Sequence, residues 1–353
     1  TGLFAPQVQM TFRYYSPSKG KNIWKSKNVD GFVVLDDRRS CKSNMFSVTF
    51  KDNGDGTEQY DVQANLDINV QLMYTMKRPS GAYGWKLGPG DQGGFSYFGE
   101  NTSSPDGYVV HRFWPYTHTS GMIVVDGQGI EVTGQGMMVQ AIQGMRPNLV
   151  AARWNFGNFQ STEHGGVSAV LMEFSTIGGY GKAKDSPRVP QTVTIGSIVY
   201  QGQLIAVVGA TREAKLDGSA VSSQSDTRTV HHDCAHDSDT GYLVPQRIEF
   251  VLDGPAIVSD EPSKDKRVHA NVSVPLGSPN AMNGLISKVD VLAEIPYFVR
   301  KIVNYVAGTK PYIYQTLNPG TLQLSLPAGM PGASDSPLEI HGIVFEEHTF
   351  ISE

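Results

Sequence analysis

The chain has 353 residues, a net charge of −5 at neutral pH and 39% hydrophobic residues. Lysine and arginine form no run along it, which argues against a nucleic-acid groove or a binding face for anionic membranes and favours an uncharged partner. No apolar stretch approaches the roughly 18 residues of a membrane-spanning helix, so no stable membrane insertion is expected. The length suffices for two domains that each bury a core.

Short segments with alternating apolar residues recur in the first part of the chain. Their period of two and their aromatic and β-branched content predict an antiparallel sheet. The NGDG sequence at 53–56 predicts a hairpin turn within it. The predicted strands cover residues 8–15, 32–35, 46–50, 60–64, 70–76, 108–113 and 122–125.

After Pro147 the same pattern restarts and predicts a second barrel or sandwich. Residues 291–306 predict one amphipathic helix, because Ile295, Phe298 and Ile302 share a face. The polar region 217–240 predicts a long surface loop. The predicted strands cover residues 153–160, 167–174, 192–208, 242–252, 268–274, 312–326 and 338–351.

The segment 134–161 concentrates methionine, aromatic and amide side chains. Thioether and aromatic groups suit the wall of a pocket for an apolar guest, and a few amides would orient its polar atoms. An ordinary core whose amides cap turns accounts for the same residues. The candidate lining residues are Met138, Gln140, Gln143, Trp154, Asn155, Phe156, Asn158 and Gln160.

The sequence HRFWPY at 111–116 offers a second candidate. Arg112 beside Trp114 would place a cationic donor next to a flat hydrophobic face, which suits the carbonyl of a stacked ligand. The alternative is a barrel rim sealed by Trp114, with Arg112 holding a loop. Pro115 limits the strand to an edge or an end, and Tyr116 follows it.

Cys41 and Cys234 both lie in polar surroundings, whereas free cysteine prefers burial, so we expect a disulfide. Asn101 and Asn271 begin glycosylation sequons, although on the order of two arise by chance in such a chain. The start at Thr1 fits a cleaved signal peptide or a trimmed chain. Together these features favour the secretory pathway, with a cytoplasmic location as the alternative.

His231, His232, Cys234 and His236 are residue types that bind zinc. Adjacent histidines in a strand point to opposite sides, and an exposed polar loop lacks the surrounding groups that hold ligands in place. We therefore predict no metal site.

Known catalytic motifs are also missing: the sequence has no hydrolase elbow, metalloprotease helix, phosphate loop or dinucleotide fingerprint. We predict no cofactor. Glu173, Glu249, Glu294 and Glu346 fall in apolar surroundings, but alternation on half-buried strands is expected to direct most such carboxylates to water.

Six stretches lie in order along most of the chain: VQMTFRYYSPSKGKNIWKSKNVDGF, HRFWP, GQGMMVQAIQGMRPNLVAARWNFGNFQS, AVLMEFST, VTIGSIVYQGQL and AEIPYFVRKIVNYVAGTKPYIYQ. Together they resemble the fungal survival-factor family of double lipocalin-like (calycin) proteins. The same architecture is shared more distantly by hydroxyneurosporene hydratase-like proteins and by fungal Diels–Alderases. The resemblance implies an all-β protein of two consecutive antiparallel lipocalin-like barrels, which we divide into residues 1–147 and 148–353.

Two departures from the family are expected. The family's amphipathic amino-terminal segment would precede Thr1, and the strands after Thr316 extend beyond the point where we expect its members to end. Both departures point away from the cytosolic lipid carrier that the resemblance implies.

The first functional hypothesis is a cofactor-independent pericyclase of fungal secondary metabolism, which catalyses a Diels–Alder or hetero-Diels–Alder [4+2] cycloaddition by confinement and hydrogen bonding. Arg112, Gln143 and Asn155 would act catalytically. The substrate-binding residues would be Trp114, Tyr116, Met138, Trp154, Phe156 and Asn158. The second hypothesis is a non-catalytic carrier of ceramide or another lipid, and the third is a metal-assisted hydratase or isomerase.

Overall fold

The computed structural model describes residues 8–82, 85–87, 95–98, 101, 103–144, 152–180, 189–213, 226–258, 261–291 and 311–351. Within these ranges nearly all regular structure is β-strand, and the helical turns are the short 3-10 segments Pro17–Lys19, Ser80–Ala82 and Glu163–Gly165. None of these helices is long and apolar enough to span a bilayer. The predicted all-β class is confirmed.

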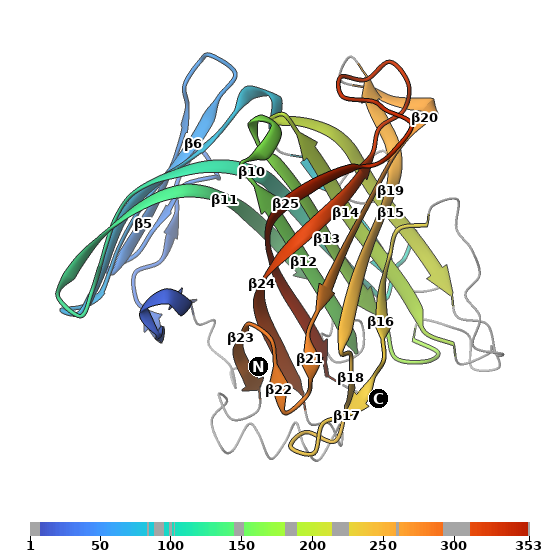
Figure 1. The fold of residues 1–353 in the computed structure, drawn as a ribbon. Coiled ribbons are helices and arrows are strands. Elements are labelled where there is room, and N and C mark those ends of the chain that lie inside the picture. Colours follow the sequence, from blue (N-terminus) through green and yellow to red (C-terminus); the bar gives the residue numbers. More distant parts are fainter. Residues whose placement is uncertain are drawn as a thin grey trace. The chain divides into compact units, whose positions relative to one another are not determined.

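The chain forms two compact units (Figure 1). Unit 1 comprises residues 1–83 and 116–137, and unit 2 comprises residues 84–115 and 138–353. Strands β10 (Gly107–Val125) and β11 (Gln128–Gly144) contribute residues to both. Pro147 lies outside the described residues, so the division into 1–147 and 148–353 stays a prediction.

A nine-stranded sheet runs in the order β11-β10-β7-β6-β5-β4-β3, and β8 and β9 pair with β10. Its other strands are β3 (Val33–Val34), β4 (Cys41–Lys42), β5 (Phe46–Asp52), β6 (Glu58–Asp67), β7 (Val70–Arg78), β8 (Trp85–Leu87) and β9 (Phe95–Phe98). The predicted turn at 53–56 joins β5 to β6, and Gly54 and Gly56 supply its positive φ angles.

The first two strands, β1 (Val8–Ser16) and β2 (Lys21–Val29), form a separate antiparallel hairpin. Met10 and Phe12 of this hairpin pack on a buried cluster that includes Leu66 and Val70. Apolar side chains at every second position of β1 thus cover one face of the sheet in unit 1.

Unit 2 contains a closed eight-stranded antiparallel barrel, in which each strand pairs with the next in the order β12-β13-β14-β15-β19-β20-β24-β25 and β25 pairs with β12 (Figure 1). These strands are β12 (Arg153–Ser161), β13 (Val167–Ser175), β14 (Gln191–Tyr200), β15 (Gln203–Glu213), β19 (Arg247–Val258), β20 (Glu261–Pro275), β24 (Tyr312–Ser325) and β25 (Leu338–Phe350). The additional strands are β16 (Arg228–His232), β17 (Ala235–His236), β18 (Leu243–Val244), β21 (Gly277–Ser278), β22 (Ala281–Met282) and β23 (Leu285–Asp290).

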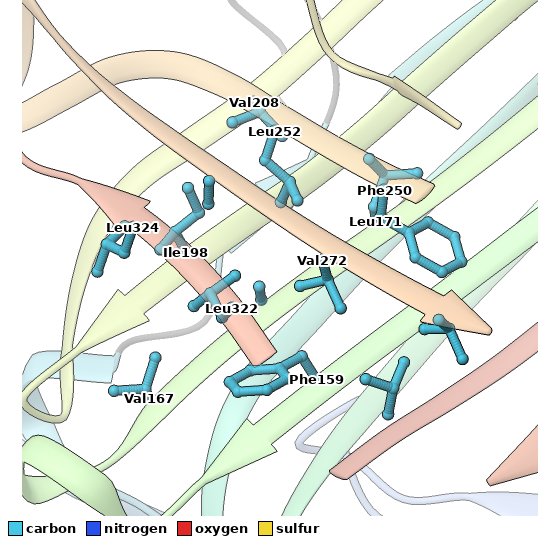
Figure 2. Packing of buried hydrophobic residues seen from close by; sticks show 14 of the residues in the cluster. Phe159, Val167, Leu171, Ile198, Val208, Phe250, Leu252, Val272, Leu322 and Leu324 are labelled. Carbon is cyan, nitrogen blue, oxygen red and sulfur yellow. The ribbon is translucent and has the colours of Figure 1, made fainter. Parts of the chain in front are cut away.

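The core of unit 2 comes from alternate residues of all these barrel strands. Figure 2 shows side chains from different strands, among them Phe159, Leu171, Phe250 and Leu322, gathered in one packed cluster. The alternation that predicts the strands therefore also selects the residues that fill the barrel.

Several predicted elements differ from the structure. Residues 242–252 are divided between β18 and β19, and residues 108–113 and 122–125 both lie in β10. Residues 192–208 form two strands, because Gln201 and Gly202 adopt positive φ angles and turn the chain. The predicted loop 217–240 contains β16 and β17 within its described part. The predicted helix 291–306 lies, apart from Val291, outside the described residues.

Candidate functional site

A groove of about 570 Å³ lies on the sheet of unit 1. It is formed by β4, β5, β6, β7 and β10 together with the loop between β4 and β5. Its volume is within the range of about 300 to 1,000 Å³ that is typical of small-molecule sites. The lining residues are Lys42, Ser43, Met45, Phe46, Ser47, Gln63, Ala64, Asn65, Gln71, Leu72, Met73, Met122 and Val124.

The strand register arranges this lining in rows across the sheet. One row passes from Gln63 to Met73 to Met122 on three neighbouring strands. The next row on the same face passes from Asn65 to Gln71 to Val124. Side chains that are directly opposite or two residues apart share a face, so three amides form a polar strip beside an apolar wall. We call Gln63, Asn65 and Gln71 the amide strip.

The lining is suited to binding rather than to acid–base chemistry. Lys42 is its one ionisable residue among those the structure describes. The side chains of the amide strip make no hydrogen bond within the described part of the chain, and each offers both donors and acceptors. The groove therefore suits an apolar ligand that carries a few neutral polar groups.

The interior of the barrel in unit 2, by contrast, is filled with side chains. The void beside Phe159, Leu171, Phe250 and Val272 measures about 10 Å³, which is about the space needed for one water molecule. At this level of the barrel there is no room for a lipid or a cycloaddition substrate.

One end of this interior is polar. Asn155 of β12 accepts a hydrogen bond from His231 Nε2 at 2.8 Å when the proton is on that nitrogen, and its own Nδ2 donates to Glu173 Oε1 at 3.3 Å. The hydroxyl of Thr194 and the backbone amide of Thr229 donate to Glu173 Oε2. The buried carboxylate is thus held by three donors, which offsets its loss of water.

A second chain of contacts lies at the same end. Thr316 donates to Glu346 Oε1 at 2.9 Å, and Glu346 Oε2 lies 3.1 Å from His348 Nδ1. Both Glu346 and His348 are fully buried. Among the described residues His348 Nε2 has no hydrogen-bond partner. The prediction that carboxylates on these strands face water is therefore wrong for Glu173 and Glu346.

Two pKa values are strongly shifted here, that of His231 by burial and that of Asp237 by hydrogen bonds that outweigh burial. Asp237 bonds the hydroxyl of Tyr314, whose ring stacks on His348. Burial, reinforced by repulsion from His348, lowers the pKa of His231 to about 3, so the ring is neutral at physiological pH. Burial alone would raise the pKa of Asp237, but hydrogen bonds from Lys288 and Tyr314 lower it to about 2. The cluster therefore combines neutral imidazole with ionised carboxylate.

The candidate residues from segment 134–161 do not gather in one pocket. Gln140 and Gln143 are exposed on β11, and Met138 is half-buried there. Asn155 faces the barrel interior, whereas its neighbours Trp154 and Phe156 are half-buried on the opposite face of β12. None of these residues lines the groove of unit 1.

The remaining candidates are similarly dispersed. Gln160 Nε2 donates to Asn158 Oδ1 and to the carbonyl oxygen of Pro115. Trp114 is fully buried, and Arg112 is half-buried on the same strand. In unit 1, the hydroxyl of Tyr116 accepts a hydrogen bond from Gln135. Their binding roles stay predictions.

The groove residues were not predicted from the sequence. The alternating stretch QLMYTM at 71–76 and the pair Met122 and Val124 carry the signal. Their significance depends on which strands are neighbours, and a single sequence does not supply that pairing.

The predicted disulfide needs correction, because Cys41 and Cys234 are both free thiols. Cys41 is half-buried in unit 1, and burial raises the pKa of its thiol. Half-burial accounts for an unpaired cysteine that the polar neighbouring sequence did not indicate. The predicted glycosylation of Asn101 and Asn271 stays a prediction.

The described residues include no group of three or more His, Cys, Asp or Glu side chains placed to hold a metal ion. His231 turns inward to Asn155, whereas His232 bonds Glu249 Oε2 at 2.7 Å. The two adjacent imidazoles thus point to opposite sides of the strand, as alternation predicts.

Comparison with known proteins places this geometry in context. The profile of the Svf1 family matches residues 1–352. A protein named ceramide-binding protein SVF1 from Candida albicans is 35% identical over 350 residues, covering 98% of this chain and 76% of that protein. The ceramide-binding protein svf1 of Aspergillus fumigatus is 33% identical over 347 residues, covering 94% of this chain and 75% of that protein.

Two solved structures align with most of this chain. One is a putative AttH from Nitrosomonas europaea, with a TM-score of 0.47, 14% identity and coverage of 98% of this chain and 83% of that one. The other is kievitone hydratase from Nectria haematococca, with a TM-score of 0.46, 9% identity and coverage of 96% and 79%.

The family match and the named relatives confirm the resemblance and correct the function drawn from it. Relatives named as ceramide-binding proteins contradict both the predicted pericyclase and the prediction that the chain is an enzyme. The family match extends to residue 352, so the strands after Thr316 belong to the family pattern and are not an addition to it.

Proposed function

Since the chain belongs to the Svf1 family, we propose that it binds ceramide or a closely related lipid in the groove of unit 1 and releases it unchanged. A ceramide has two long hydrocarbon chains, a secondary amide and hydroxyl groups. It is uncharged, and both the composition of the chain and the lining of the groove favour an uncharged ligand.

The observation that carries the proposal is the position of the amide strip beside apolar side chains. Met73, Met122 and Val124 offer a thioether and aliphatic surface on one side of it. Methionine adapts its shape to flexible hydrocarbon chains at little cost. Gln63, next to Met73, can both donate to and accept from the lipid amide.

The first test is binding of a ceramide with a fluorescent acyl chain. Met73→Glu and Met122→Glu each place a charge where the hydrocarbon would lie. We expect affinity to fall by about tenfold or more, because burying an unpaired charge is costly. Ile142→Glu is the matched control, since Ile142 is an exposed apolar residue on a strand outside the groove lining, and its affinity should stay within about twofold of the wild type.

The second test concerns the polar contacts. Gln63→Leu and Gln71→Leu should weaken the binding of ceramide more than the binding of a diacylglycerol, which has hydrocarbon chains but no amide. Lipid recovered after incubation should have an unchanged mass. If all four groove variants bind ceramide as tightly as the wild type does, the lipid binds elsewhere. If the recovered lipid has a changed mass, the protein is not a simple carrier.

A further inference from the structure

The groove exposes two methionine side chains to solvent. Met73 and Met122 are 62% and 50% exposed and lie directly opposite each other on neighbouring strands. A Cβ atom built at Gly129 would lie 3.5 Å from Met122 Sδ, so this sulfur lies beside a residue that has no side chain to cover it. Met282 of unit 2, in contrast, is buried.

We propose that Met73 and Met122 form a reversible oxidation site that lowers the affinity of the groove for lipid. This inference rests on the proposed function, because the oxidised side chains act on the same lipid contacts.

The reaction is a two-electron oxygen transfer from hydrogen peroxide. A sulfur lone pair attacks one peroxide oxygen, an S–O bond forms, the O–O bond breaks, and water leaves after proton transfer. The thioether becomes a sulfoxide, and methionine sulfoxide reductases reverse the change. Exposure makes Met73 and Met122 react before buried methionines do.

The sulfoxide changes the balance between the empty and the filled groove. In the filled groove its oxygen would lie against hydrocarbon without a hydrogen-bond donor, which opposes binding. In the empty groove the oxygen on Met73 can accept a hydrogen bond from water or from the adjacent Gln63 amide. Both effects favour release, and two sulfurs on one row act on the same stretch of lipid.

The experiment treats the full chain with limiting hydrogen peroxide, maps the sulfoxides by mass spectrometry and measures binding of the fluorescent ceramide before and after treatment. We expect Met73 and Met122 to be oxidised before Met282, and affinity to fall by about tenfold or more. Bound ceramide should protect both sulfurs. A sulfoxide reductase should restore the affinity.

The double variant Met73→Leu/Met122→Leu separates these sulfurs from the rest of the chain. Whatever its starting affinity, oxidation should change it by less than about twofold. Met330→Leu, at a half-buried methionine of unit 2, should lose as much affinity for ceramide on oxidation as the wild type does. If oxidised wild type binds ceramide as well as reduced protein does, the oxidation site is ruled out while the proposed function stands. If reduced protein binds no ceramide, both fail.

Discussion

Tyr314 and His348 stack face to face inside the barrel of unit 2, with ring centroids 4.8 Å apart and ring planes 7° from parallel. Both side chains are fully buried. The Tyr314 hydroxyl donates to Asp237 Oδ2 at 2.6 Å and lies 2.7 Å from the Thr240 hydroxyl. The stack thus joins the Glu346 and Asp237 carboxylates through two aromatic rings.

Tyr314→Phe should keep the stack and remove the hydroxyl. Asp237 and Thr240 each lose a buried partner, so we expect the free energy of unfolding to fall by about 1 to 3 kcal/mol. Denaturant titration measures the change. Tyr312→Phe, on the same strand at a half-buried position, should cost less than about 0.5 kcal/mol, and equal losses in the two variants would show that the hydroxyl of Tyr314 has no special role.

Glu58 holds two arginines in unit 1, at 2.8 Å from Arg39 Nη1 and 2.9 Å from Arg78 Nη2. Arg78 is buried, so Glu58→Gln would leave a buried cation without its carboxylate. We expect unit 1 to lose about 2 to 3 kcal/mol, somewhat less than a fully buried pair because Glu58 is partly exposed.

Hydrogen exchange of the β6 and β7 amides reports on this change. The control is Glu131→Gln on β11, since Glu131 is exposed, and it should leave exchange unaffected. Unchanged exchange in Glu58→Gln would mean that the two ion pairs contribute no net stability.

The free cysteines give a third prediction. Burial raises the pKa of both thiols, with a further upward contribution from Asp37 for Cys41 and from Asp233 for Cys234. We expect a thiol reagent to label both in native protein, and to label exposed Cys234 before half-buried Cys41. The intact mass should not change when reductant is added. A mass that rises on reduction would show that the two cysteines form a disulfide.

The strands could be predicted because each alternating segment defines its own face. Residues 46–50, 60–64 and 70–76 all lie in strands of unit 1, as expected. Alternation of apolar residues does not predict β2, because its sequence KNIWKSKNV is largely polar. This strand is instead specified by its pairing with β1, which is a tertiary contact.

The groove could not be predicted in the same way. Met73 and Met122 meet because β7 pairs with β10 in one particular register, and alternation within a strand does not specify that partner. The prediction that Glu173 and Glu346 face water also assumed open, half-buried strands. Barrel closure buries them, and the threonine hydroxyls that make this burial tolerable lie on neighbouring strands.

The last prediction follows from the neutral state of His231. Its pKa is about 3 in the folded protein and about 6.5 in an unfolded chain. Between these values the unfolded chain binds more protons, so stability decreases as the pH falls below about 6.5. For this group alone the free energy of unfolding should be about 2 kcal/mol lower at pH 5 than at pH 7. His111, whose pKa burial lowers to about 4, adds a decrease of the same sign.

Denaturant titrations at pH 7 and pH 5 measure how much His231 contributes to the decrease in the free energy of unfolding. His231→Gln keeps a donor for Asn155 Oδ1, which the imidazole Nε2 contacts at 2.8 Å, and removes the titrating ring. The decrease between the two pH values should therefore be smaller in this variant by about 2 kcal/mol. His341→Gln, at an exposed position on β25, should retain the decrease of the wild type. If the His231→Gln variant loses as much stability as the wild type between pH 7 and pH 5, His231 is not held neutral by the barrel.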